Sequence, residues 1–166
     1  MEMYCTLRRV SQEKLDSYIQ DNHLLLEDFF SNEFREVPQL DIDKSWAGIQ
    51  YLLEKVSEQQ DSGLNLAEII SGNSSIHKIG DSYEERVRYL VPKDVKVLNE
   101  ELKTLKSEQL RTHFNSKAML ELAIYPGIWQ DEHSFAYLSE YFTKLQSFYQ
   151  HASWANEAVV IMINPS

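Results

Sequence analysis

The sequence predicts a single α+β domain in which helices pack around a small sheet that includes the N-terminal and C-terminal strands. Three observations support this fold class. The 166 residues match the usual size of one domain, and the 43% of apolar residues suffice for one core. Both ends of the chain have strand-like sequences, and much of the chain between them has apolar residues at helical spacing. No linker-like stretch divides residues 1–166, so we expect one domain.

The N-terminal part of the chain begins with a strand and continues with helices. Residues 3–10 alternate loosely between apolar and polar types and include β-favouring side chains, which indicates a strand. Ser11 is the expected N-cap of a first helix that ends near Asp21. A second helix is expected over residues 24–34, because Pro38 and the residue before it disfavour a helix.

The middle of the chain combines one firm helix with a weakly patterned region. Residues 40–46 introduce a helix in which Trp46 and the following apolar residues recur at steps of three or four, ending near Ser57. A short helix is expected over residues 64–70. The glycine-rich and serine-rich stretch that follows shows little regular structure. If any loop of this chain moves, the sequence points to the one over residues 71–87.

The C-terminal half contains the strongest helical patterns. Pro92 suits the first residue of a helix. Ser107 is the expected N-cap of a short helix around Leu110, and Asn115 or Ser116 is the expected N-cap of another. Residues 134–152 form the longest amphipathic pattern. The uncharged, β-branched run that closes the chain, residues 158–163 (AVVIMI), predicts a strand buried on both faces, with the N-terminal strand as its expected partner.

Charge and cysteine content exclude several functional classes. The formal net charge of −10 disfavours binding to nucleic acids and to anionic membranes. A basic protein partner or a cationic ligand remains open beside the simpler view that acidity keeps the chain soluble. The single cysteine, Cys5, lies in the first strand, where burial would keep its thiol inert, which suits a reducing compartment. Without a secretory signal or membrane-spanning segment, the expected location is the cytoplasm.

Four stretches resemble the YfbM-like proteins, a bacterial family known mainly as a domain of unknown function. They are LDIDKSW at 40–46, RYLVPKDV at 88–95, EQLRTHF at 108–114 and IYPGIW at 124–129. The chain departs from this pattern at YEERV, residues 83–87, where relatives have a Gly-Tyr-Gly-Pro-like stretch, and at Glu2, where Gly is usual. The resemblance implies an α+β fold with helices around a small sheet, and it implies no established activity, cofactor or partner.

Two carboxylates in the first matched stretch are candidates for a site. Asp41 and Asp43 lie two residues apart, next to Lys44 and just before an expected helix. Such a pair can coordinate Mg²⁺ or act as acid and base with different pKa values. The structural alternative is that one of them caps the helix and the other lies near its positive end.

Aromatic residues and an arginine complete the set of candidate binding residues. Trp46, Tyr125 and Trp129 can line an aromatic pocket for a planar ligand or a protein partner, or they can be ordinary core. Arg88 can clamp a carboxylate or phosphate, or it can form an ion pair within the fold, for which Asp43 is the expected partner.

Known catalytic and metal-binding motifs do not occur in the sequence. The histidines lack metal-ligand spacing, and neither a nucleophile elbow nor a phosphate-binding glycine loop occurs. We therefore expect no metal and no cofactor.

The first functional hypothesis is a non-enzymatic cytosolic interaction module, of the inhibitor or immunity type, that binds a protein partner through an acidic, aromatic-edged surface. The alternative is a small hydrolase or transferase whose site gathers Asp41, Asp43, Arg88, Tyr125 and Trp129 in one cleft. Whether these five side chains converge in space distinguishes the two hypotheses. The sequence does not fix the oligomeric state.

Overall fold

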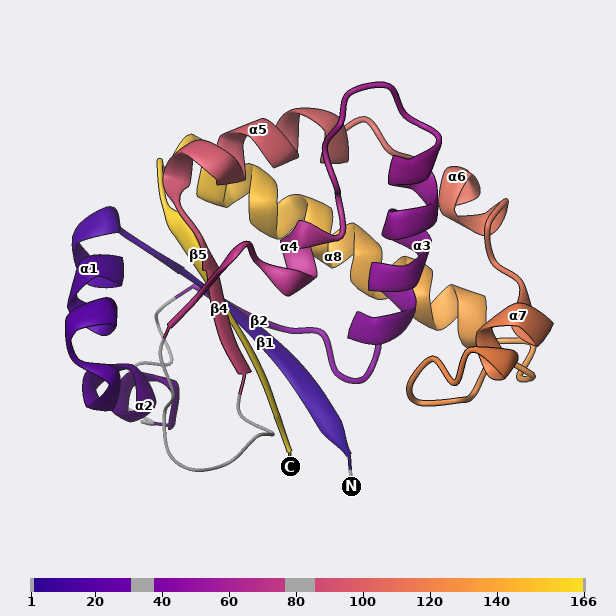
Figure 1. The fold of residues 1–166 in the computed structure, drawn as a ribbon, viewed down its shortest axis with the longest axis horizontal. Coiled ribbons are helices and arrows are strands. Elements are labelled where there is room, and N and C mark those ends of the chain that lie inside the picture. Colours follow the sequence, from indigo (N-terminus) through magenta and orange to yellow (C-terminus); the bar gives the residue numbers. More distant parts are fainter. Residues whose placement is uncertain (1, 31–37, 77–85, 166) are drawn as a thin grey trace.

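An antiparallel sheet crosses the centre of the fold (Figure 1). The computed structural model describes residues 2–30, 38–76 and 86–165, and the side chains of Phe30, Arg86 and Pro165 are not described. Within these ranges the sheet has five strands in the order β2-β1-β5-β4-β3. The strands are β1 (Met3–Val10), β2 (Gln39–Asp41), β3 (Ser74–Ser75), β4 (Arg86–Leu90) and β5 (Ala158–Pro165).

The two terminal strands form the middle of this sheet. β1 and β5 pair over their whole lengths, from Met3 opposite Pro165 to Val10 opposite Ala158. The expected pairing of the chain's first and last strands is therefore confirmed. Residues 158–162 of β5 are buried on both faces of the sheet, as the uncharged run predicts.

Helices cover both faces of the sheet (Figure 1). They are α1 (Gln12–Gln20), α2 (Asn22–Phe30), α3 (Trp46–Glu58), α4 (Glu68–Ser71), α5 (Pro92–Leu102), α6 (Ser107–Arg111), α7 (Ser116–Glu121) and α8 (Ser134–Trp154). In the parts of the chain that the structure describes, none of them is long and apolar enough to cross a membrane. Together with the sheet they confirm the α+β fold class.

Successive side chains of the strands point to opposite faces of the sheet and so belong to two separate cores. Leu7 and Ile161 point into the large core, which includes buried residues of α3, α5 and α8. Val160 and Met162 point to the other face, where α1 and α2 cover a smaller core. The molecule therefore has three layers, with the sheet in the middle.

Buried polar residues attach α2 to the sheet in the smaller core. The buried guanidinium of Arg8 on β1 donates through Nη2 to the Asp28 backbone carbonyl at 2.7 Å and to Gln39 Oε1 at 2.9 Å. It also lies 4.7 Å from the centre of the Phe29 ring. The buried Asp28 carboxylate accepts from the Tyr18 hydroxyl at 2.6 Å. A guanidinium near the last carbonyls of a helix is favoured by the helix dipole.

The helix boundaries follow the sequence expectations closely. Ser11 accepts from the Lys14 N–H and Asn115 accepts from the Ala118 N–H, so the N-caps predicted at Ser11 and at Asn115 are confirmed. Pro92 is the first residue of α5, as predicted. The expectation that Ser107 is an N-cap is wrong, because Ser107 is the first residue of α6 and its N-cap is Lys106.

Differences from the expectations concern short elements and the limits of the description. The helix expected over residues 64–70 is shorter, because α4 spans Glu68–Ser71. The short strands β2, β3 and β4 were not predicted. The end of the helix expected over 24–34 and the part of the 71–87 loop between 77 and 85 lie outside the described residues.

Candidate functional site

The chain turns sharply between β2 and α3, and the two candidate carboxylates lie in this turn. Asp41 Oδ1 accepts a hydrogen bond from the Asp43 backbone N–H at 2.7 Å. Asp43 has a φ of 55°, in the left-handed region that Asp tolerates better than most residues. The N-cap of α3 is Ser45, whose hydroxyl donates to the Ile42 carbonyl. The expectation that Asp41 or Asp43 caps this helix is therefore wrong.

Asp43 instead connects the turn to α8. The Tyr137 hydroxyl donates a short hydrogen bond to Asp43 Oδ2, and the same hydroxyl oxygen accepts from the Lys44 N–H at 3.0 Å. Burial, and next the hydrogen bond to Asp43, raise the pKa of the Tyr137 phenol above its ordinary value of 10. Across the described residues, no group of three or more His, Cys, Asp or Glu is placed to hold a metal ion.

The Trp46 and Tyr125 side chains cover the free edge of β1 beyond the end of β2. The Met3 N–H donates to the Tyr125 hydroxyl oxygen at 2.7 Å, and Trp46 Nε1–H donates to the Met3 carbonyl at 3.0 Å. The two rings stack with centroids 5.7 Å apart. Because β2 pairs only with residues 6–8 of β1, these two side chains take the place of a neighbouring strand at Met3.

Lys44 belongs to a small exposed cluster at the same end of β1. Its Nζ lies 2.9 Å from Glu2 Oε1, and Glu2 Oε2 accepts from the Tyr4 hydroxyl at 2.7 Å. The hydrogen bond to Lys44, and next that to Tyr4, lower the pKa of the Glu2 carboxyl, and the hydrogen bond to Glu2 raises the pKa of Lys44. The lysine is thus engaged within the chain, and the pair stabilises the fold only weakly because it is exposed.

Trp129 is a core residue that anchors the turn over residues 124–127. Its ring is fully buried and packs edge-on against Phe114, and Nε1–H donates to the Ile124 carbonyl at 2.8 Å. The Gly127 N–H donates to the same carbonyl at 3.0 Å. On α3, Gly48 leaves room for the indole, because an added Cβ would lie 2.6 Å from Trp129 Cη2. Trp129 therefore does not line an open pocket.

Arg88 lies far from the carboxylates with which it was expected to pair. Its Nε donates to the Ser71 carbonyl at 2.9 Å and its Nη1 to the Ser75 hydroxyl. Arg88 lies on β4, and β5 and β1 lie between β4 and β2. β4 is therefore roughly three strand spacings of about 4.8 Å from β2. The expected ion pair between Arg88 and Asp43 is not formed. The five residues of the proposed enzyme site therefore do not converge.

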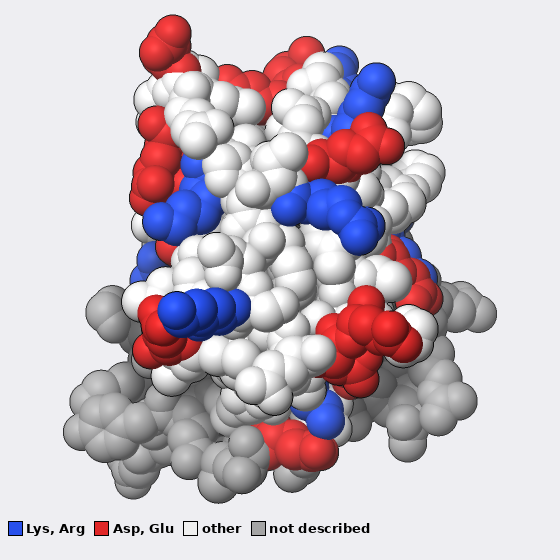
Figure 2. Space-filling model, turned by 90° about the vertical axis from the view of Figure 1, so that its right-hand side faces the viewer, with Lys and Arg blue, Asp and Glu red and all other residues white. Residues whose placement is uncertain are grey.

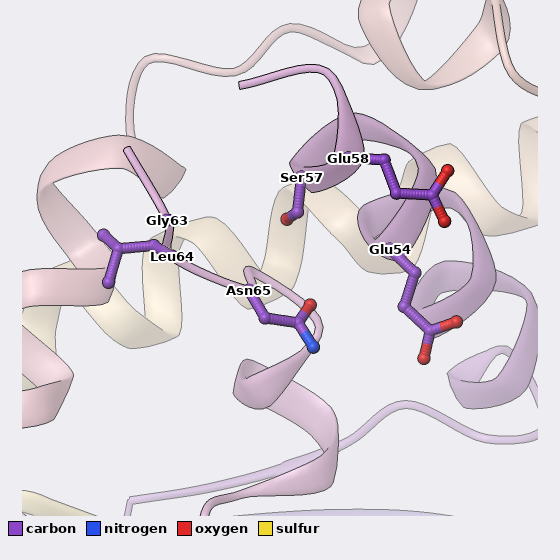
Figure 3. Close-up of a pocket in the computed structure, with 6 residues that line it drawn as sticks. All are labelled: Glu54, Ser57, Glu58, Gly63, Leu64 and Asn65. Carbon is purple, nitrogen blue, oxygen red and sulfur yellow. The ribbon is translucent and has the colours of Figure 1, made fainter. Parts of the chain in front are cut away.

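An open cavity of about 340 Å³ lies elsewhere, between the C-terminal turns of α3 and the loop that follows (Figure 3). It is lined by Glu54, Ser57, Glu58, Gly63, Leu64 and Asn65. None of the candidate site residues predicted from the sequence lines it. The only sequence signal for this cavity is a pair of carboxylates four residues apart on α3, a spacing common on exposed helix faces.

The turn that follows α7 presents apolar side chains to solvent. Leu122 is 59% exposed and Ile128 is 40% exposed. Every residue from 122 to 128 is exposed or half-exposed, and we call these seven residues the 122–128 surface. On the side of the molecule where α6 and α7 lie, Figure 2 shows a broad uncharged area with charges of both signs around it. Neither Leu122 nor Ile128 is among the binding residues predicted from the sequence, although Ile128 belongs to IYPGIW.

Comparisons with known proteins agree with this fold. No curated protein matches the chain. The crystal structure of YfbM from Escherichia coli, a protein of unknown function, is similar with a TM-score of 0.73 and 20% sequence identity, covering 98% of this chain and 99% of that chain. At this identity the likeness shows the fold alone. The model of a family described as a domain of unknown function, DUF1877, matches residues 1–162, so the chain belongs to the DUF1877 family.

Proposed function

We propose that this protein is a non-enzymatic interaction module that binds a protein partner through the 122–128 surface. The observation that carries the proposal is the pair of exposed aliphatic side chains, Leu122 and Ile128, at the two ends of one fixed turn. Covering large exposed apolar side chains with a partner makes the free energy of binding more favourable, by about 25 cal/mol for each Å² of apolar area that is buried.

The turn is held in place before any partner binds. The Gly127 N–H donates to the Ile124 carbonyl and closes the turn. The indole N–H of the buried Trp129 donates to the same carbonyl and holds it in place. Tyr125 is tied to Met3 of β1 and stacks on Trp46 of α3. A preordered surface loses little conformational entropy on binding, which favours affinity.

The rival enzyme hypothesis lacks support from the geometry. It requires Asp41, Asp43, Arg88, Tyr125 and Trp129 in one cleft, yet Arg88 lies at the far side of the sheet and Trp129 is buried in the core. Asp43 and Tyr125 use their polar groups to hold Tyr137 and Met3. We therefore propose binding rather than catalysis.

The test is affinity capture from cell extract with wild-type protein and two variants. The variant Leu122→Ser/Ile128→Ser removes both apolar side chains from the 122–128 surface. The control Val97→Ser removes an aliphatic side chain on α5 that is 42% exposed, matching Ile128 in exposure. All three proteins are compared at equal concentration after their melting temperatures have been measured.

We expect wild type and Val97→Ser to retain the same protein in stoichiometric amount, and Leu122→Ser/Ile128→Ser to lose it. Truncating buried interface anchors typically costs about 2 kcal/mol or more per hot-spot residue, which is enough to abolish capture at modest affinity. Equal recovery by all three proteins, or recovery of no stoichiometric partner by wild type, contradicts the proposal.

A further inference from the structure

We draw no further inference here: the strongest candidate, the surface patch at the C-terminal end of α8 where Trp154 is 75% exposed and contacts the His151 ring edge-on, carries nothing because no feature of the described residues shows what covers it.

Discussion

The Tyr125 hydroxyl oxygen accepts a hydrogen bond from the Met3 backbone N–H at 2.7 Å, across 122 residues of sequence. Trp46 completes this contact by donating to the Met3 carbonyl. The two aromatic residues come from LDIDKSW and IYPGIW, the stretches that resemble the family. Their shared task in this structure is to cover the edge of β1 and to hold the turn that carries the 122–128 surface.

We predict that Tyr125→Phe destabilises the fold. The substitution leaves the Met3 N–H without its acceptor and should cost about 1 kcal/mol, which lowers the melting temperature of a domain of this size by about 2–4 °C. Thermal denaturation followed by circular dichroism measures the change. Tyr51→Phe is the matched control, because the described structure gives that hydroxyl no hydrogen bond and its removal should leave the melting temperature unchanged.

We predict that the stability of Asp43 variants depends on two properties: whether the new side chain can accept from Tyr137, and whether it tolerates a positive φ. Asp43→Asn keeps an oxygen for Tyr137 and tolerates the positive φ, so it should be the mildest change. Asp43→Gly loses the acceptor but relaxes the backbone. Asp43→Ala loses the acceptor and keeps the strained φ, and should cost roughly 1–2 kcal/mol more than Asp43→Asn. Urea denaturation of the three variants gives the order, and an alanine variant as stable as the asparagine variant contradicts it.

Magnesium should not change the stability of wild type or of the Asp41→Ala and Asp43→Ala variants. The Asp41 carboxylate accepts from the Asp43 N–H within the turn, and the Asp43 carboxylate accepts from the Tyr137 hydroxyl on α8. Melting temperatures with and without Mg²⁺ test this directly. Stabilisation of wild type that both variants lose would show that these carboxylates hold a metal.

Stability should fall in alkaline solution, in part through Tyr137. Its folded-state pKa is raised above the ordinary value of 10 by burial and by Asp43, so the folded chain holds the phenolic proton more tightly than the unfolded chain. The resulting stabilisation is complete below pH 10 and is lost as the pH rises above 10. The free energy of unfolding should therefore fall less steeply with pH in Tyr137→Phe than in wild type. Parallel pH curves would contradict this assignment.

Gly48→Ala should destabilise the fold although alanine favours helices. The new methyl group would lie 2.6 Å from Trp129 Cη2 and 2.9 Å from Leu138 Cδ2. Overpacking of this kind costs about 1–3 kcal/mol, against a gain of about 1 kcal/mol from helix propensity. A double-mutant cycle with Trp129→Phe measures the collision, because the smaller ring should reduce the cost of the added methyl group. If the effects of the two substitutions on stability are additive, the added methyl group does not clash with the Trp129 ring.

Local patterns in the sequence predicted the long elements of this fold correctly. α5 and α8 have apolar positions at helical spacing, and β1 and β5 have β-favouring residues in uninterrupted runs. The short strand β2 could not be predicted in the same way. It has three residues, too few to show a period, and it forms because the Asp43 turn places it beside β1.

The roles of the candidate site residues depended on contacts between distant parts of the chain. The spacing of Asp41 and Asp43 suits a helix cap, yet Tyr137, 94 residues away, takes the Asp43 side chain. Arg88 was expected beside Asp43, but the strand order puts two strands between them. Exposure of Leu122 and Ile128 results from the way the turn packs on Trp129, which no local pattern shows.

Site-specific photocrosslinking tests the proposed binding surface most directly. A photoreactive amino acid replaces Leu122 in one protein and Val97 in another, and both are irradiated in living cells that express them. We predict a discrete crosslinked protein partner from position 122 and none from position 97. Equal crosslinking from both positions, or none from position 122, would contradict the assignment of the 122–128 surface as a protein-binding site.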